Sequence, residues 1–283
     1  MSARRQFRAN WRIDNIRTLR SRYERACRVA PQGTHEWRLI EAGDRHIRVL
    51  VHDPECHRDC AIFYFHGGGW IVGSPSTHAD ISGALATATG LPVISIDYRL
   101  APEHKAEAAI ADGLAVIAHY LGKGGKFATG ILAGDSAGGS IALAAAHRTL
   151  NTSLKIAGVL SFYGAFGLAA NPGLHSAAST RAGLDATSMR RYRLAANASA
   201  GISPYSVPAL AHADGPPVYL LAAGLDPVRD DTIALARALR EKGRSVTIDL
   251  LPFVDHSFLQ ASHAHHAKQT ALRNIARWIT ALA

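Results

Sequence analysis

The sequence predicts an α/β fold, in which a largely parallel sheet is covered by helices on both faces. From residue 36 onward, segments rich in β-branched and aromatic residues alternate with Ala-rich segments at helical spacing, which is the pattern of such a sheet. With 48% hydrophobic and 19% charged residues among 283, the chain can bury a large core. Its length fits one large domain or two small ones, and we find no repeat or linker that divides it.

Eight segments are candidate strands because they are short, apolar and rich in strand-forming residues. They are Glu36–Ala42, Arg45–His52, Ala61–Phe65, Pro92–Asp97, Gly130–Ala133, Ala157–Phe162, Pro217–Ala222 and Val246–Leu251. Five longer segments have helical spacing. They are Ser76–Thr89, Ala106–Leu121, Gly138–Leu150, Asp230–Lys242 and His263–Ala281. Between Gly164 and Gly215 the alternation breaks, and this Ala-, Ser- and Arg-rich stretch is interpreted as an insertion over one end of the sheet.

The net charge of +9 is concentrated at the N-terminus. The first thirty residues hold nine arginines against Asp14 and Glu24, so this segment carries +7 and the remaining 253 residues only +2. Such a segment is compatible with nucleic acid, an anionic membrane surface or an acidic substrate. Because the arginines at positions 5, 8, 12, 17 and 20 follow helical spacing, with apolar residues between them, we interpret it as an amphipathic helix with a solvated basic face.

The sequence shows no signal for export or membrane insertion. It has no apolar run of the roughly 18 to 20 residues that a membrane span needs, and its Arg-rich start lacks the apolar run of a secretory signal. The three cysteines, Cys27, Cys56 and Cys60, are too few for a disulfide framework, and the last two lack the second pair of a structural metal site. We therefore expect a cytoplasmic protein without a metal.

The strongest chemical signal is a serine between glycines. An apolar strand leads into Gly134-Asp135-Ser136-Ala137-Gly138-Gly139, and a helical segment follows directly. Glycines two residues before and after Ser136 permit a sharp strand-to-helix turn that lifts its hydroxyl off the sheet. The start of the next helix offers N–H groups to a developing negative charge. Ser136 is therefore the candidate nucleophile.

A serine nucleophile needs a base that is oriented by a carboxylate. The best base is His256, in a loop just after the last predicted strand. The best acid is Asp226, the first acid after the strand Pro217–Ala222. Asp230 and Asp231 are better explained as residues of a first helical turn, where acids favour the helix dipole.

A second glycine motif ends another strand. His66-Gly67-Gly68-Gly69-Trp70 follows Ala61–Phe65, seventy residues before the serine. Consecutive glycines let a backbone approach a ligand closely and aim several N–H groups at one point. Acyl transfer requires such donors, because its tetrahedral intermediate carries an oxyanion.

These two motifs together resemble the hormone-sensitive-lipase-like esterases of the α/β-hydrolase superfamily. The resemblance covers about residues 35–283 and includes Ser95–His104, Ser203-Pro204, Asp226-Pro227 and Asp255-His256. It implies an α/β-hydrolase fold with a mostly parallel eight-stranded sheet and a small helical cap. The cap would combine an N-terminal segment, residues 1–34, with an insertion at about 165–214.

The resemblance also implies roles for single residues. Ser136 would be the nucleophile, His256 the general base and acid, and Asp226 the orienting carboxylate. The oxyanion donors would be the backbone N–H groups of Gly67, Gly68 and Ala137. His66 and Asp135 would hold loops in place.

The sequence thus predicts a cofactor-independent serine hydrolase of carboxylic esters with small to medium acyl groups. Its partner would be a small-molecule ester, with no nucleic acid and no membrane span, and a homodimer is left open. Arginines of the cap, among them Arg181, Arg190, Arg191 and Arg193, would favour a substrate with a carboxylate or phosphate. The alternatives are an amidase or formamidase with the same triad and a ligand-binding protein on the hydrolase scaffold.

Overall fold

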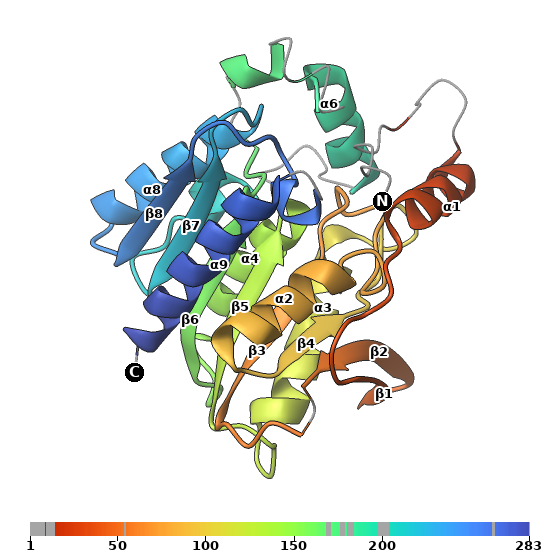
Figure 1. Cartoon of the computed structure of the whole chain (residues 1–283), viewed down its shortest axis with the longest axis vertical. Helices are drawn as coiled ribbons and strands as arrows, with labels where there is room; N and C mark the ends of the chain where they lie inside the picture. Colours follow the sequence, from red (N-terminus) through yellow and green to blue (C-terminus); the bar gives the residue numbers. More distant parts are fainter. Residues whose placement is uncertain are drawn as a thin grey trace.

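The computed structural model describes residues 9, 15–53, 55–167, 171–175, 179, 184–196, 204–261 and 264–282. Its centre is one eight-stranded sheet with the strand order β1-β2-β4-β3-β5-β6-β7-β8 (Figure 1). The pairs β1/β2 and β2/β4 are antiparallel, and all other neighbouring strands are parallel. This arrangement confirms the predicted α/β-hydrolase fold.

All eight predicted strands are present, with ends shifted by a few residues. The strands are β1 His35–Ala42, β2 Arg45–His52, β3 Cys60–Phe65, β4 Val93–Ile96, β5 Thr129–Asp135, β6 Ile156–Phe162, β7 Val218–Ala223 and β8 Val246–Leu251. The largest difference is β5, which continues to the residue just before Ser136.

The five predicted helices are also present. The helices that follow strands are α2 Ala79–Thr89, α3 Ala106–Leu121, α4 Ala137–Thr149, α8 Arg229–Glu241 and α9 His265–Thr280. The first of them begins three residues later than expected, because the Thr77 N–H donates to the Ser74 carbonyl in a turn that precedes it. The residue His263 lies outside the described residues.

Alternate residues of β3 face two different cores. Phe63 and Phe65 belong to the core shared with α3 and α4, whereas Ile62 and Tyr64 belong to the core shared with α2 and α9. This alternation follows from the two-residue period of a strand, and burial on both faces explains why the sequence of β3 is apolar throughout. Figure 1 shows α2 and α9 together on the near side of the sheet.

The N-terminal basic segment forms a helix where the structure describes it. This helix, α1 Ile16–Cys27, begins at Asn15, whose side chain accepts a hydrogen bond from the Thr18 N–H. Leu19 and Tyr23 are buried, so one face of the helix packs against the body of the protein, as predicted. Apart from Ala9, the part of the expected helix before residue 15 lies outside the described residues.

Helical pieces also make up the described residues between 165 and 214. They are η1 Pro172–His175, α6 Ala186–Ala195 and α7 Val207–Leu210, and no strand occurs in the described part of this stretch. In Figure 1, α6 lies above the sheet and α1 lies to its right. No described helix combines the length and the apolar character that crossing a membrane requires.

Removing the buried contact of α1 tests its packing. Leu19 is 1% exposed, whereas Leu39 on β1 is 65% exposed. We expect Leu19→Ala to lower the midpoint of thermal unfolding by about 5 °C, since a buried Leu→Ala change removes apolar contacts and leaves a cavity. Leu39→Ala is the matched control and should shift the midpoint by less than about 2 °C. Equal shifts in calorimetry would show that α1 is not part of the folded core.

Candidate active site

Ser136 lies on a tight turn between β5 and α4. Its backbone has a φ of 52°, a left-handed conformation that is unfavourable for residues other than glycine. The turn brings α4 so close to β3 that a Cβ at Gly138 would clash with the Phe65 carbonyl oxygen, and one at Gly134 would clash with Gly138. Both glycines are therefore required by the close approach of the backbones.

His256 and Asp226 lie beside Ser136. A hydrogen bond of 2.9 Å joins His256 Nε2 to Ser136 Oγ, and one of 2.7 Å joins His256 Nδ1 to Asp226 Oδ2. The other carboxylate oxygen of Asp226 accepts the Val228 N–H at 2.9 Å. The three side chains follow the carboxyl ends of β5, β7 and β8, which are parallel and separated only by β6. The structure thus brings together the nucleophile, base and acid that the sequence predicts.

In the glycine loop after β3, the N–H groups that are available to a ligand differ from the predicted set of oxyanion donors. The Gly67 N–H donates to the Asp135 carboxylate at 2.8 Å, so it cannot also bind a substrate oxygen, and Gly67 does not line the cavity. Gly68, Gly69 and Ala137 do line it, and their N–H groups donate no hydrogen bond in the part of the chain that the structure describes. In this structure the N–H of Gly67 is thus bound to Asp135, and Gly69 is a further candidate donor beside Gly68 and Ala137.

Two sets of buried contacts hold this loop. The Asp135 carboxylate also accepts the Tyr64 hydroxyl at 2.6 Å. The Tyr98 hydroxyl donates to the His66 carbonyl at 2.6 Å, and the two rings stack with centroids 4.2 Å apart. Burial raises the pKa of Asp135 and lowers the pKa of His66 to about 3. The loop therefore rests on fixed polar groups, which is how preorganised donors are maintained.

The helix α1 is fastened to the same loop by one arginine. Arg20 donates to the carbonyl oxygens of Ile71 and Ala101, both at 2.8 Å. It also forms a two-pronged ion pair with Glu103, at 2.8 and 2.7 Å. A guanidinium has the fixed planar donors that such a junction needs.

Ser136 and His256 open into a cavity of about 440 Å³, a volume within the range of small-molecule sites. The cavity lies between the carboxyl ends of the strands and the helices α1 and α6. Tyr192 of α6 packs so closely on the glycine loop that a Cβ at Gly69 would clash with its ring. Tyr23 and Cys27 of α1 contribute another part of the lining.

No arginine or lysine lines this cavity in the described part of the chain. Arg190 and Arg191 are exposed on α6, Arg193 of the same helix does not line the cavity, and Arg181 lies outside the described residues. Within the described ranges no group of three or more His, Cys, Asp or Glu is arranged to hold a metal ion.

Several lining residues were not found by sequence reasoning. They are Tyr23, Cys27, His78, Tyr192, Ser257 and Gln260. Of these, only Ser257 had a sequence signal, because it directly follows His256. The others come from segments distant in sequence, and no local pattern places them at the site.

Comparison with known proteins defines the class. A family model for the alpha/beta hydrolase fold matches residues 62–260, a range that includes Ser136, Asp226 and His256. The chain belongs to this family.

Solved structures extend the similarity to the whole chain. A hyperthermophilic esterase from the archaeon Pyrobaculum calidifontis is 27% identical over 95% of each chain, with a TM-score of 0.82. An ester-hydrolase from the metagenome of Lake Arreo is 24% identical over 97% of this chain and 92% of its own, with a TM-score of 0.84. A thermostable carboxylesterase cloned from a metagenomic library is 24% identical over 95% and 98%, with a TM-score of 0.82. The last two similarities show the shared fold.

Buried neutral histidines predict a loss of stability in acid. Burial lowers the pKa of His52 to about 4 and that of His66 to about 3, so the unfolded chain binds more protons than the folded one below about pH 6.5. Each histidine then removes about 1.4 kcal/mol of stability per pH unit as the pH falls from about 6.5 toward its folded pKa.

The variant His52→Gln tests this dependence. Glutamine can still hydrogen-bond the Ser82 hydroxyl, which lies 2.8 Å from His52 Nε2. Between pH 7 and 5 the variant should lose about 2 kcal/mol less stability than the native protein, measured by calorimetry at each pH. His46→Gln, at an exposed position of β2, is the control and should leave the pH dependence unchanged. An unchanged curve for His52→Gln would contradict the prediction.

Proposed function

We propose that this protein hydrolyses carboxylic esters through an acyl-enzyme formed on Ser136. The observation that supports it most directly is the hydrogen-bonded chain Asp226–His256–Ser136, with bonds of 2.7 and 2.9 Å, at a cavity that Gly68, Gly69 and Ala137 help to line. The archaeal esterase, similar over nearly the whole chain, supports ester bonds as the target. His256 accepts the Ser136 proton while the serine oxygen attacks the acyl carbon.

The negative charge of the tetrahedral intermediate would be held by the N–H groups of Gly68, Gly69 and Ala137. Ala137 is the first residue of α4, so the electropositive end of that helix adds to the stabilisation. His256 then returns the proton to the leaving alcohol, and Asp226 keeps the imidazole oriented and stabilises its charged form. Water repeats the sequence on the acyl-enzyme and releases the acid.

The helices above the strand ends are proposed as the cap of this site. Residues 1–34 and about 165–214 would form it, and in the described residues α1 and α6 both contribute side chains to the cavity. A cavity of about 440 Å³ closed by short helices supports acyl groups of small to medium length.

Replacing the serine tests the reaction. Ser136→Ala should lower kcat for p-nitrophenyl butyrate at least about 10⁴-fold, because neither base nor oxyanion donors can replace the nucleophile. A fluorophosphonate probe should label the native protein covalently and leave this variant unlabelled, as detected by intact mass.

Two results would overturn the proposal. An unlabelled native protein would revive the ligand-binding alternative. Faster cleavage of an anilide than of the matched butyrate ester would favour the amidase alternative.

Acyl length is tested with a series of p-nitrophenyl esters from acetate to palmitate. We expect kcat/KM to peak at an acyl chain of six carbons or fewer and to fall roughly tenfold or more by twelve carbons, since each methylene outside the cavity loses its favourable burial. A flat profile, or a maximum at long chains, would contradict the assignment to small and medium acyl groups.

A further inference from the structure

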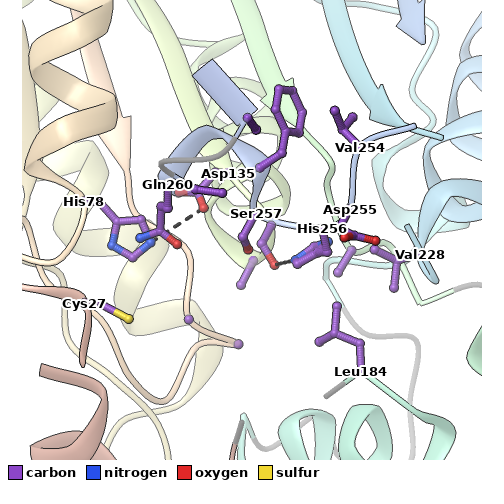
Figure 2. A pocket seen from close by; sticks show the side chains of 18 of the residues that line it. Cys27, His78, Asp135, Leu184, Val228, Val254, Asp255, His256, Ser257 and Gln260 are labelled. Carbon is purple, nitrogen blue, oxygen red and sulfur yellow. Dashed lines mark hydrogen bonds and ion pairs between the residues drawn. The ribbon is translucent and has the colours of Figure 1, made fainter. Parts of the chain in front are cut away.

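The cavity beside Ser136 has two chemically different walls. Figure 2 shows Leu184, Val228 and Val254 on one side of His256, and Cys27, His78 and Gln260 on the other, with Ser257 between His256 and the second group. The first wall is mainly apolar, and the Asp255 carboxylate lies on the same side of His256. The second offers hydroxyl, amide, imidazole and thiol groups, and we call Ser257, Gln260 and His78 the polar wall.

Ser257 is held in an unfavourable backbone conformation. Its φ is 60°, although only glycine adopts this region without a steric penalty. The residues on either side hold Ser257 in this conformation. His256 hydrogen-bonds with Ser136, whereas Phe258 is buried and packs on Tyr163. The Ser257 hydroxyl lines the cavity and makes no hydrogen bond to any described residue. A serine at this strained position therefore presents a donor and an acceptor to whatever occupies the cavity.

Hydrogen bonds to neighbouring residues hold the other two residues of the polar wall, Gln260 and His78, in position. Gln260 Nε2 donates to the Thr77 carbonyl oxygen at 3.1 Å, and the same side chain hydrogen-bonds with Tyr23. His78 is 1% exposed, and its Nδ1 lies 2.8 Å from the Thr77 hydroxyl. These contacts order the polar groups before a ligand arrives, which reduces the entropy lost on binding.

The charges of the described lining disfavour one class of ligand. Its described lining holds no Lys or Arg but includes the carboxylates of Asp135 and Asp255. A carboxylate or phosphate on the substrate would be desolvated here without a cationic partner, which is unfavourable. The positive charge of the N-terminal segment therefore does not extend into the described lining of the cavity.

We propose that the polar wall selects a neutral ester whose acyl or alcohol part carries a hydroxyl group, with Ser257 as the residue that binds this hydroxyl. The proposal rests on the ester-hydrolase function proposed above and names its substrate class. The Ser257 hydroxyl forms one hydrogen bond with the substrate hydroxyl, as its donor or as its acceptor, and Gln260 lies beside it in the same wall. The apolar wall receives the other part of the ester.

Two pairs of esters test the proposal on the full-length protein. One places the hydroxyl on the acyl side, p-nitrophenyl 3-hydroxybutyrate against p-nitrophenyl butyrate. The other places it on the alcohol side, 2-hydroxyethyl butyrate against propyl butyrate. In one pair we expect kcat/KM to be roughly 5-fold higher for the hydroxyl ester, the effect of one additional neutral hydrogen bond. That pair identifies the side that contacts Ser257.

Two substitutions separate the hydroxyl from the backbone strain. Ser257→Ala removes the hydroxyl and keeps the strained conformation, whereas Ser257→Gly removes both. The preference for the hydroxyl ester should disappear equally in the two variants, while Ser257→Gly should unfold at a higher temperature than Ser257→Ala. Gln260→Met should weaken the preference as well. Ser245→Ala, an exposed serine outside the cavity, is the matched control and should retain it.

Each contrary result overturns the proposal. The proposal fails if neither pair shows a preference for the hydroxyl ester, or if that preference survives in both Ser257 variants. It also fails if kcat/KM is higher for mono-p-nitrophenyl succinate than for p-nitrophenyl butyrate. In each of these cases, the native protein would still hydrolyse p-nitrophenyl butyrate and Ser136→Ala would not, if the proposed ester-hydrolase function is right. Failure of the hydroxyl-ester proposal can therefore be told apart from failure of the proposed function.

Discussion

The hydrogen bond from the Gly67 N–H to the Asp135 carboxylate joins the two glycine motifs, which are nearly seventy residues apart in the sequence. Asp135 is the last residue of β5 and precedes Ser136, while Gly67 is the second residue of the loop that follows the adjacent strand β3. A single carboxylate therefore sets the position of the glycine loop relative to the serine turn. Because this carboxylate is buried and also accepts the Tyr64 hydroxyl, the distance between the two motifs is determined by the interior of the sheet.

The elements of the fold could be predicted because their signals are local. A strand such as β3 is apolar throughout since it is buried on both faces, and Ser136 is marked by the glycines that its turn requires. His256 and Asp226 could be found because each follows a strand end. Parallel strands bring such residues to one edge of the sheet.

The details that sequence reasoning missed depend on contacts between distant segments. The hydrogen bond from Gly67 to Asp135 leaves Gly68 and Gly69 as the glycines that line the cavity. A run of three glycines in the sequence does not show which of them bonds to a distant carboxylate. The polar wall combines His78, from the turn before α2, with Ser257 and Gln260, from the segment after β8, so no sequence window contains it. The arginines of α1 suggested a charged site, but the partners of Arg20, at Ile71, Ala101 and Glu103, could be recognised only in three dimensions.

Arg20 connects the N-terminal helix α1 to the glycine loop beside Ser136. Its guanidinium bonds the carbonyl of Ile71, two residues beyond Gly69, and so connects α1 directly to the loop that carries the candidate oxyanion donors. The end of α9, by contrast, lies at the far side of the sheet from α1 (Figure 1). For attachment to a surface or fusion to another protein, the C-terminus is therefore the end that leaves the geometry around Ser136 undisturbed.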